Sequence, residues 1–223
     1  MPRPPVPDLS LERELWSAGH GVVAGLDEVG RGAWAGPLTI AAVVVPAAGR
    51  VNGIRDSKQL TESRREELFD RITAWCAHVS VGHVSPLECD ALGMSAAMRL
   101  AGWRALDGLG VEVDRILLDG SWDFLGDDRV VTVVRGDASC RSIAAASVVA
   151  KVTRDRIMRA DAPSYPAFEF ERNKGYPSPR HRLALAGYGP TAIHRRSWSY
   201  MDQLPWPHLR VAPVTTGAGA AVS

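Results

Sequence analysis

The feature that most constrains the fold of this chain is the run at residues 37–45, which is nearly all apolar and rich in β-branched side chains. A strand of that composition is typical of a sheet buried on both faces. A second apolar run at residues 21–26 precedes it and predicts another strand. The segment between the two runs contains Gly30-Arg31-Gly32, so the sequence predicts a hairpin with a glycine-rich connection.

Further along the chain, strand patterns alternate with helix patterns. Residues 61–78 predict an amphipathic helix, because apolar side chains recur every three or four positions and Ser63 with Glu66 fits a capping box at its start. A helix is also expected at residues 86–109, where small residues keep helical spacing. The other predicted elements are strands at residues 79–84, 113–118 and 130–134 and a helix at residues 142–159. This alternation predicts an α/β fold.

The two ends of the chain carry weaker patterns. Residues 1–17 hold four prolines and no clear period, so they predict an extended N-terminal arm with one turn near residues 11–16. We expect a single domain over residues 18–205 and a flexible tail over residues 206–223, which becomes rich in Gly and Ala from Gly217.

Composition limits the class of protein. The 223 residues are 46% hydrophobic and 23% charged, as in ordinary globular chains. No apolar run approaches the roughly 20 residues of a membrane span, and the N-terminus lacks a signal-peptide pattern. We therefore expect a cytoplasmic monomer that does not contact membranes. The cysteines, Cys76, Cys89 and Cys140, are odd in number and lack C-x-x-C spacing, which favours neither disulfides nor zinc.

Charge is distributed unevenly, although the net charge is only +1. Residues 141–200 contain 11 Lys and Arg against 4 Asp and Glu, which makes this region +7 and leaves −6 for the remainder. Such an asymmetry suits an enzyme that attracts a polyanion to one region and gathers acids in another. A basic, solvated surface without function is the alternative that charge alone leaves open.

Four acids stand at the predicted strand ends. Asp27 and Glu28 end the first apolar run, and Asp119 and Asp137 follow two later strands. Two such charges about 4 Å apart repel by roughly 4 kcal/mol at an effective dielectric of about 20, so a cation is expected beside them. Ligation by oxygen alone favours Mg²⁺ or Mn²⁺, and two such ions about 4 Å apart suit displacement at phosphorus. Taken singly, Asp119 and Asp137 also fit ordinary Asp-Gly or Gly-Asp turns.

A dinucleotide-binding turn is a rival interpretation of the same stretch. Gly30, Gly32 and Gly36 approximate the G-x-G-x-x-G pattern after a strand, but the last spacing is one residue too long. The adjacent Asp27 and Glu28 would also repel the pyrophosphate that such a turn binds. The spacing and the charge both argue against a nucleotide cofactor.

Over about residues 20–200 the chain resembles bacterial ribonuclease HII. The resemblance is carried, in order, by Asp27-Glu28-Val29-Gly30-Arg31-Gly32, Gly36-Pro37, Asp56-Ser57-Lys58, Leu118-Asp119-Gly120, Gly136-Asp137-Ala138, Ile143-Ala144-Ala145-Ala146-Ser147, Ala150-Lys151-Val152-Thr153-Arg154-Asp155, Gly175-Tyr176 with His181, and His194-Arg195-Arg196-Ser197. The sequence departs from the usual family pattern at Gly93, Ser121 and Ser178. None of these departures affects the four acids.

The resemblance implies a ribonuclease H-like fold, with a mixed five-stranded sheet flanked by helices and a helical C-terminal part. It also implies an endoribonuclease that cleaves the RNA strand of RNA/DNA hybrids. Such an enzyme nicks duplex DNA 5′ of an embedded ribonucleotide, as ribonucleotide excision repair requires, and leaves 3′-hydroxyl and 5′-phosphate ends. In this resemblance Asp27, Glu28, Asp119 and Asp137 are the catalytic, metal-binding acids, and the cofactor is Mn²⁺ or Mg²⁺.

Substrate contacts are implied in the same way. Gly30, Arg31 and Gly32 would read the ribose 2′-hydroxyl, because glycine lets backbone donors and acceptors approach a sugar closely. Tyr176 would stack on the sugar next to the cut, and Lys58 would contact phosphate. Lys151, Arg154, Arg195 and Arg196 are further candidates for phosphate neutralisation. Asp155 is expected to stabilise its helix or to support the site from behind.

Two alternatives to this function remain open. A ribonuclease HIII-like hybrid nuclease would usually carry an extra N-terminal domain and lack the arginine between the two glycines, whereas Arg31 is present here. A non-catalytic hybrid-binding protein would keep the basic region and lose acids, and this chain has all four.

Overall fold

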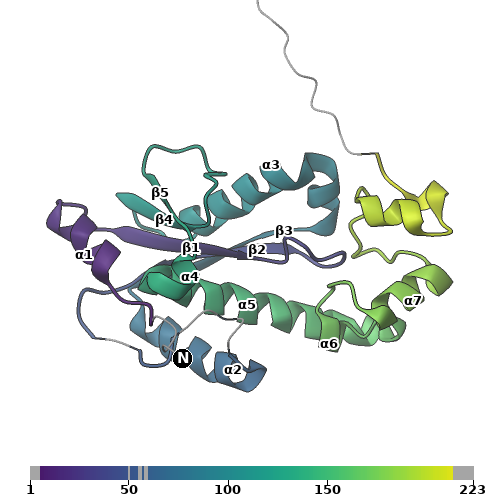
Figure 1. Cartoon of the computed structure of the whole chain (residues 1–223), viewed down its shortest axis with the longest axis horizontal. Coiled ribbons are helices and arrows are strands. Elements are labelled where there is room, and N and C mark those ends of the chain that lie inside the picture. The colour runs from purple at the N-terminus through teal and green to yellow at the C-terminus, as the bar shows by residue number, and fades with distance from the viewer. Residues whose placement is uncertain (1–5, 50, 55–56, 58–59, 213–223) are drawn as a thin grey trace, which may run out of the picture.

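The computed structural model describes residues 6–49, 51–54, 57 and 60–212, and its centre is a five-stranded sheet (Figure 1). The strand order is β3-β2-β1-β4-β5, in which β1–β2 and β2–β3 are antiparallel and β1–β4 and β4–β5 are parallel. The strands are β1 (Val23–Val29), β2 (Leu38–Val44), β3 (His78–Val84), β4 (Arg115–Asp119) and β5 (Val130–Val133). The mixed five-stranded α/β sheet is therefore confirmed.

The predicted hairpin is formed by β1 and β2, but β1 is longer than expected. It continues through the acids to Val29, with Asp27 paired to Ala41 and Glu28 paired to Ile40. The sequence interpretation ended this strand at residue 26, because the acids interrupt the apolar run. Backbone pairing with β2 holds the acids inside the strand, so consecutive side chains there point to opposite faces of the sheet.

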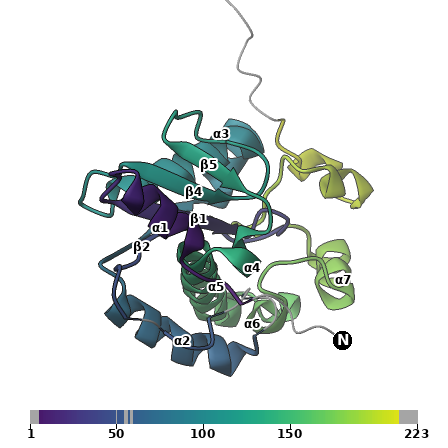
Figure 2. The ribbon, with the colours of Figure 1, turned by 60° about the vertical axis from the view of Figure 1, so that its left-hand side comes forward.

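Each face of the sheet is covered by helices (Figure 2). Helix α3 (Pro86–Asp107) packs on the face that carries Leu26 and Ile40. Helix α5 (Arg141–Asp161) packs on the opposite face against Ala41 and Val43, and α2 (Glu62–Trp75) lies outside α5. All of β2 is buried, as its composition predicts.

Side-chain caps stabilise the starts of α3 and α2. In α3, Ser85 and Glu88 form a reciprocal capping box. In α2 the cap is Thr61, whose hydroxyl accepts the Arg64 amide at 3.3 Å. The predicted box at Ser63 and Glu66 is wrong, because the helix begins at Glu62 and Glu66 instead pairs with Arg156 and Arg159.

The N-terminal segment contains a helix, α1 (Ser10–Ser17), where an extended arm with one turn was expected. Its side chain Glu12 is fully buried and accepts the Ser142 amide at 2.7 Å, at the start of α5. A carboxylate at this place stabilises the positive end of the α5 dipole. Residues 10–17 therefore pack onto the fold at one of its main helices.

The C-terminal part is helical, as predicted, and lies beyond the C-terminal end of α5 (Figure 1). Its elements are α6 (Phe170–Asn173), α7 (Pro179–Tyr188) and the short 3₁₀ helices at Ala162–Ser164, Pro166–Phe168, Ser199–Gln203 and Pro207–Leu209. They share a core with Trp34, which stacks on Tyr200 at 4.3 Å between ring centroids. Within the predicted tail, the Trp206 indole donates to the Leu185 carbonyl at 3.0 Å; the boundary at residue 206 stays a prediction.

Two further observations concern the composition arguments. In the part of the chain that the structure describes, no helix is long and apolar enough to cross a membrane. Cys76, Cys89 and Cys140 are all free, and the last two are buried.

Candidate active site

The sheet topology brings three strands of the predicted site together. Strand β4 pairs in parallel with β1, with Leu118 opposite Leu26, so Asp119 and Asp27 are the next residues along the two neighbouring strands. Strand β5 pairs with β4 and leads into α4 (Gly136–Ser139), whose first turn contains Asp137. Asp137 therefore lies at the start of a short helix and not directly at a strand end.

Asp119 fixes the position of this short helix. Its Oδ1 accepts the Gly136 amide at 2.7 Å and the Asp137 amide at 3.3 Å. Arg135, just before the helix, has φ of 56°, the left-handed region that is rare for a residue with a side chain. Backbone strain of this kind is kept where surrounding contacts hold it, and here it turns the chain so that Asp137 approaches β4.

The electrostatics of Asp27 show that the acids act on one another. Its side chain is 8% exposed, and its Oδ1 accepts the Glu28 amide at 2.8 Å. The pKa of Asp27 is raised well above its ordinary value, first by burial and then by the charge of Glu28 and of Asp119, with a smaller contribution from Asp137; a hydrogen bond with Ser147 opposes the rise. Four carboxyl groups thus share one electrostatic environment, as the strand-end pattern predicts.

The donor set is suited to a hard cation. Among the described residues, no group of three or more Cys, His, Asp or Glu side chains is already arranged to hold a metal ion. The four acids offer only oxygen ligands, and burial with mutual repulsion raises the free energy of the charged Asp27 carboxylate. A divalent cation would relieve that repulsion, and oxygen ligation is what Mg²⁺ and Mn²⁺ prefer. Their role as metal ligands stays a prediction.

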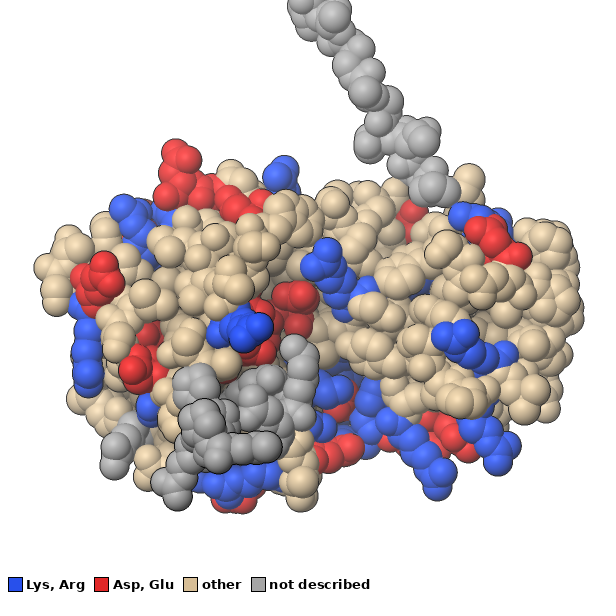
Figure 3. Space-filling model, in the orientation of Figure 1, with Lys and Arg blue, Asp and Glu red and all other residues tan. Residues whose placement is uncertain are grey.

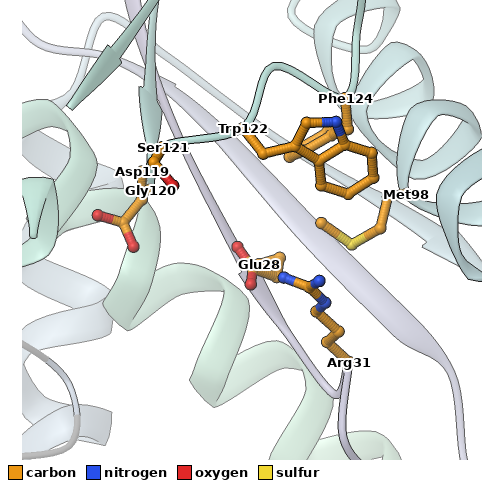
Figure 4. A pocket seen from close by; sticks show the side chains of 8 residues that line it. All are labelled: Glu28, Arg31, Met98, Asp119, Gly120, Ser121, Trp122 and Phe124. Atoms are coloured by element: carbon orange, nitrogen blue, oxygen red, sulfur yellow. The ribbon is translucent and has the colours of Figure 1, made fainter. Parts of the chain in front are cut away.

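Two adjacent cavities open beside the acids. The first, of about 360 Å³, we name the Trp122 cavity; its lining includes Glu28, Arg31, Met98, Asp119, Trp122 and Phe124 (Figure 4). The second, of about 350 Å³, we name the Tyr176 cavity; its lining includes Asp27, Glu28, Arg31, Gly32, Ser147, Lys151 and Tyr176. Glu28 and Arg31 line both cavities, while Asp27 lines only the Tyr176 cavity. This division follows from the strand geometry, because Glu28 points to the α3 side of the sheet and Asp27 to the α5 side.

The two glycines beside Arg31 have different surroundings. Gly30 has φ of +87°, and a Cβ there would meet Arg154 Nε at 2.3 Å and the Pro37 carbonyl at 2.7 Å. At Gly32 a Cβ would meet nothing within 4 Å. Packing within the protein therefore explains Gly30 and does not explain Gly32, which lines the open Tyr176 cavity.

Tyr176 lies next to the glycine-rich turn. Its hydroxyl accepts the Gly30 amide at 3.0 Å. The guanidinium of Arg154 lies 5.3 Å from the ring centroid and the Lys151 ammonium 5.8 Å from it. The Tyr176 carbonyl is held by His181 Nδ1 at 2.9 Å. Tyr176 is thus fixed at its backbone and at its hydroxyl.

Two arginines expected to neutralise phosphate do something else. Arg154 and Arg195 are both fully buried. Arg154 donates to the carbonyls of Pro37, Lys174 and Ala35 at 2.8, 2.8 and 2.9 Å, and Arg195 donates to those of Arg31 and Gly36 at 3.2 and 3.1 Å. That candidate role is wrong for these two, because neither guanidinium reaches the surface. They hold the backbone around the glycine-rich turn.

The other basic candidates differ in position. Lys151 lines the Tyr176 cavity and is held at 2.8 Å by the buried Asp155, one turn further along α5. This pair fits both roles expected of Asp155. Arg196 donates from Nε to the Leu209 carbonyl at 2.7 Å. Lys58, the expected phosphate contact, lies outside the described residues.

Residues of the site that the sequence reasoning did not single out are Met98, Trp122 and Phe124 in the Trp122 cavity. Met98 belongs to the core as well, because it is 1% exposed and still lines this cavity. Trp122 follows Asp119 by three residues, and an aromatic residue so soon after a predicted catalytic acid is a signal that could have identified it.

On the surface, acidic and basic side chains adjoin one another near the middle of the face shown in Figure 3. Much of the basic excess counted in residues 141–200 is neutralised within the fold. Arg156 and Arg159 pair with acids of α2, namely Glu62 and Glu66, and Lys174 also pairs with Glu62. The positive region is therefore smaller than the count implies.

Comparison with known proteins gives a consistent result. The family model described as Ribonuclease HII matches residues 24–201. A curated ribonuclease HII from Streptomyces avermitilis is 49% identical over 213 residues, which cover 94% of this chain and 91% of that protein. Among solved structures, the ribonuclease H2 of Pyrococcus horikoshii has 31% identity and a TM-score of 0.69, covering 82% of this chain and 96% of that one. The fold is also shared by the structure of Bst-RNase HIII in complex with Mn²⁺. Its sequence identity to this chain is 18% and its TM-score is 0.64, and the match covers 82% of this chain and 68% of that one.

Proposed function

Since the chain belongs to the ribonuclease HII family, its membership supports endoribonuclease activity on RNA/DNA hybrids, and we propose that the protein also nicks duplex DNA on the 5′ side of an embedded ribonucleotide. The observation that carries the proposal is the placement of the acids, because Asp119 lies beside Asp27 on the neighbouring parallel strand and holds the turn that carries Asp137. Carboxylates gathered in this way suit a site that binds cations at a phosphodiester.

The metal-binding role is assigned to Asp27, Glu28, Asp119 and Asp137. With Mg²⁺ or Mn²⁺ bound there, the site would gain a Lewis acid that generates the attacking hydroxide and stabilises the departing 3′ oxygen. Asp119 also holds the turn that carries Asp137, through the amides of Gly136 and Asp137. The products of this reaction are 3′-hydroxyl and 5′-phosphate ends.

Selection of a ribonucleotide is assigned to Gly30, Arg31, Gly32 and Tyr176. The open space at Gly32 supports this assignment, because a backbone without a side chain leaves room for a sugar edge. Donor and acceptor groups of a backbone can both be used by a 2′-hydroxyl, which is itself donor and acceptor. The glycine-rich turn and Tyr176 are both predicted to contact a sugar. The hydrogen bond from the Gly30 amide to the Tyr176 hydroxyl connects them directly.

The remaining predictions complete this proposal. Lys151 offers a cation at the mouth of the Tyr176 cavity, and the proposed partners are RNA/DNA hybrid and ribonucleotide-containing duplex DNA. A monomeric state and a cytoplasmic location stay predictions. A ribonuclease HIII-like enzyme is less well supported, since the HIII structures found are at most 18% identical to this chain and share only its fold.

The proposal is tested by mapping the cleavage site on a duplex with one embedded ribonucleotide, with Mg²⁺ and with Mn²⁺ in turn. We expect a nick 5′ of the ribonucleotide that requires the metal and is absent from an all-DNA duplex. Binding of the duplex without cleavage under every metal condition would instead indicate a non-catalytic hybrid-binding protein.

Asp119→Asn tests the four-acid arrangement in the same assay. The Asn Oδ1 can still accept the Gly136 amide, so we expect thermal stability close to wild type and cleavage reduced by at least about a hundredfold. Asp107→Asn is the matched control, because Asp107 is exposed at the end of α3 and lines neither of the two site cavities. Full activity of Asp119→Asn would refute the assignment.

A further inference from the structure

The Trp122 cavity carries an aromatic residue to which nothing above assigns a role. Trp122 is 42% exposed, although its indole is a large apolar group. It lines the same cavity as Glu28 and Asp119, two of the four acids (Figure 4). An exposed apolar side chain next to a predicted catalytic centre is typical of a contact for a ligand.

The loop that carries Trp122 is held by the residues that follow it. Phe124 and Leu125, two and three positions after Trp122, are 3% and 2% exposed and pack against α3, where a Cβ at Gly102 would meet Leu125 at 2.6 Å. The Asp123 carboxylate accepts the amides of Leu125 and Gly126, both at 2.9 Å. The fold therefore buries the neighbouring apolar side chains and presents Trp122 at the cavity in a fixed position.

The ring of Trp122 faces a small number of groups. It makes an edge contact with Phe124 at 5.8 Å between ring centroids. The Arg31 guanidinium lies over the ring, 5.8 Å from its centroid. Since Arg31 lines both cavities, Trp122 and Tyr176 occupy two cavities that meet at Arg31 and Glu28.

We propose that Trp122 packs its indole ring against a sugar of the nucleic acid, in a subsite on the other side of Glu28 and Arg31 from Tyr176. The inference rests on the proposed function and adds a subsite to it. Tyr176 would then contact one sugar and Trp122 another, so that an aromatic ring would lie against the nucleic acid on each side of the acids.

A sugar fits this subsite better than a phosphate or the face of a base. Glu28 and Asp119 in the same cavity repel a phosphate, and Arg31 is the cation that the lining supplies. In a duplex the base faces are stacked on one another, whereas sugar edges are accessible along the minor groove. An aromatic ring on an apolar sugar edge also tolerates any base sequence.

The test is equilibrium binding without divalent metal, followed by the fluorescence anisotropy of a labelled duplex with one ribonucleotide, at several salt concentrations. Trp122→Ala should weaken binding by about 5- to 30-fold, and Trp122→Phe, which keeps a ring, should restore most of the affinity. Because the contact is apolar, the slope of log affinity against log salt should equal that of wild type. Arg31→Ala should lower that slope by about one unit.

Tyr188→Ala is the matched control, because Tyr188 is a 76% exposed aromatic residue on α7 that lines neither site cavity. It should bind as wild type does. Trp122→Leu serves as a second variant that keeps apolar volume at the loop, and it should lose affinity as Trp122→Ala does.

Two outcomes would overturn the inference. If Trp122→Ala and Trp122→Leu bind like wild type, the ring makes no contact with the nucleic acid. If Trp122→Ala changes the salt slope as Arg31→Ala does and adds no effect in an Arg31→Ala background, the ring acts only by positioning Arg31. Failure of the wild-type protein to bind or cleave any ribonucleotide-containing duplex would instead refute the proposed function.

Discussion

The two glycines around Arg31 are a pair of identical residues with different reasons to be glycine. Gly30 combines a positive φ with contacts that leave no room for a Cβ, from Arg154 and from the Pro37 carbonyl. Gly32 has open space around it and faces the Tyr176 cavity. At the residue scale, the packing constraint at Gly30 and the proposed sugar contact at Gly32 therefore lie on either side of Arg31.

Alanine at each position should separate these reasons. Gly30→Ala should lower the free energy of unfolding by at least about 1–3 kcal/mol, because the residue must adopt a left-handed conformation against buried neighbours. Gly32→Ala should change it by less than about 0.5 kcal/mol and should raise KM for a ribonucleotide-containing duplex. Urea unfolding and steady-state cleavage measure the two effects. Equal loss of stability in both variants would contradict this division.

Residue types and spacing predicted which acids belong to the candidate site and failed for the arginines. Asp27, Glu28 and Asp119 follow from strand positions, because the sheet brings neighbouring strands into register. In the sequence, Arg154 and Arg195 cannot be told from arginines on the surface. They are buried because they donate to carbonyls far away in sequence, such as those of Pro37 and Gly36. Local pattern contains no information on those distant partners.

At the scale of elements, the buried arginines connect parts of the chain that are otherwise separate. Arg154 on α5 reaches the β1–β2 connection and the segment before Tyr176, and Arg195 reaches the same connection from the C-terminal part. Each guanidinium donates to several carbonyls from one planar group, which lysine cannot do. The glycine-rich turn is therefore held by two helical regions at once.

Arg195→Lys should loosen this connection. The ammonium keeps the charge but cannot replace both hydrogen bonds to Arg31 and Gly36, so we expect a loss of about 1–3 kcal/mol in the free energy of unfolding. Because the Arg31 carbonyl is one of the two acceptors, KM should also rise. The same substitution at the exposed Arg172 is the control and should change neither quantity. A variant as stable as wild type would show that the two bonds contribute little.

Element types were predicted well from periodicity, and their ends were not. The acids in β1 interrupt the apolar pattern and therefore predict the end of the strand, but pairing with β2 extends the strand to Val29. In helix α1, Leu11, Leu15 and Trp16 recur at helical spacing and pack against the core, and the four prolines before the helix obscured that pattern. The end of β1 depends on pairing with β2, which a local window does not contain, whereas the pattern of α1 was present in the sequence.

Across the whole molecule, two buried histidines link the C-terminal part to the active site. Thr191 donates its amide to His194 Nδ1, so His194 must donate from Nε2 to His181 Nε2 at 2.8 Å. His181 then donates from Nδ1 to the Tyr176 carbonyl. This chain of hydrogen bonds requires both rings to be neutral. Burial lowers the pKa of His181, and burial together with the neighbouring ring lowers that of His194 to about 3.

The pair should make stability sensitive to acid. In the unfolded chain both histidines have a pKa of about 6.5, so below that pH the unfolded state binds more protons than the folded state. Stability should therefore fall as pH drops from about 6.5 towards 3, by up to about 1.4 kcal/mol per pH unit for each histidine. Urea unfolding at pH 7.5, 6.5 and 5.5 measures the slope. His194→Gln should give a shallower slope than wild type, and an unchanged slope would exclude the pair as its source.

Global charge was the least informative part of the sequence. Eleven basic residues in residues 141–200 suggested a broad positive surface, but folding pairs several of them with acids of α2 and buries two others. Charge counts do not show which side chains face each other across helices. A nucleic acid would meet a smaller positive area near Lys151 and Arg31.

The opposite orientations of Asp27 and Glu28 in β1 also help to prevent β1 and β2 from pairing in the wrong register. If β1 paired with β2 one residue out of step, the two acids would exchange sides, and so would Leu26, which is fully buried against α3. A hairpin able to form the wrong site would thus lose part of its hydrophobic core. For the same reason, inserting or deleting a single residue in this strand should destabilise the fold, so that no folded protein with altered chemistry would result.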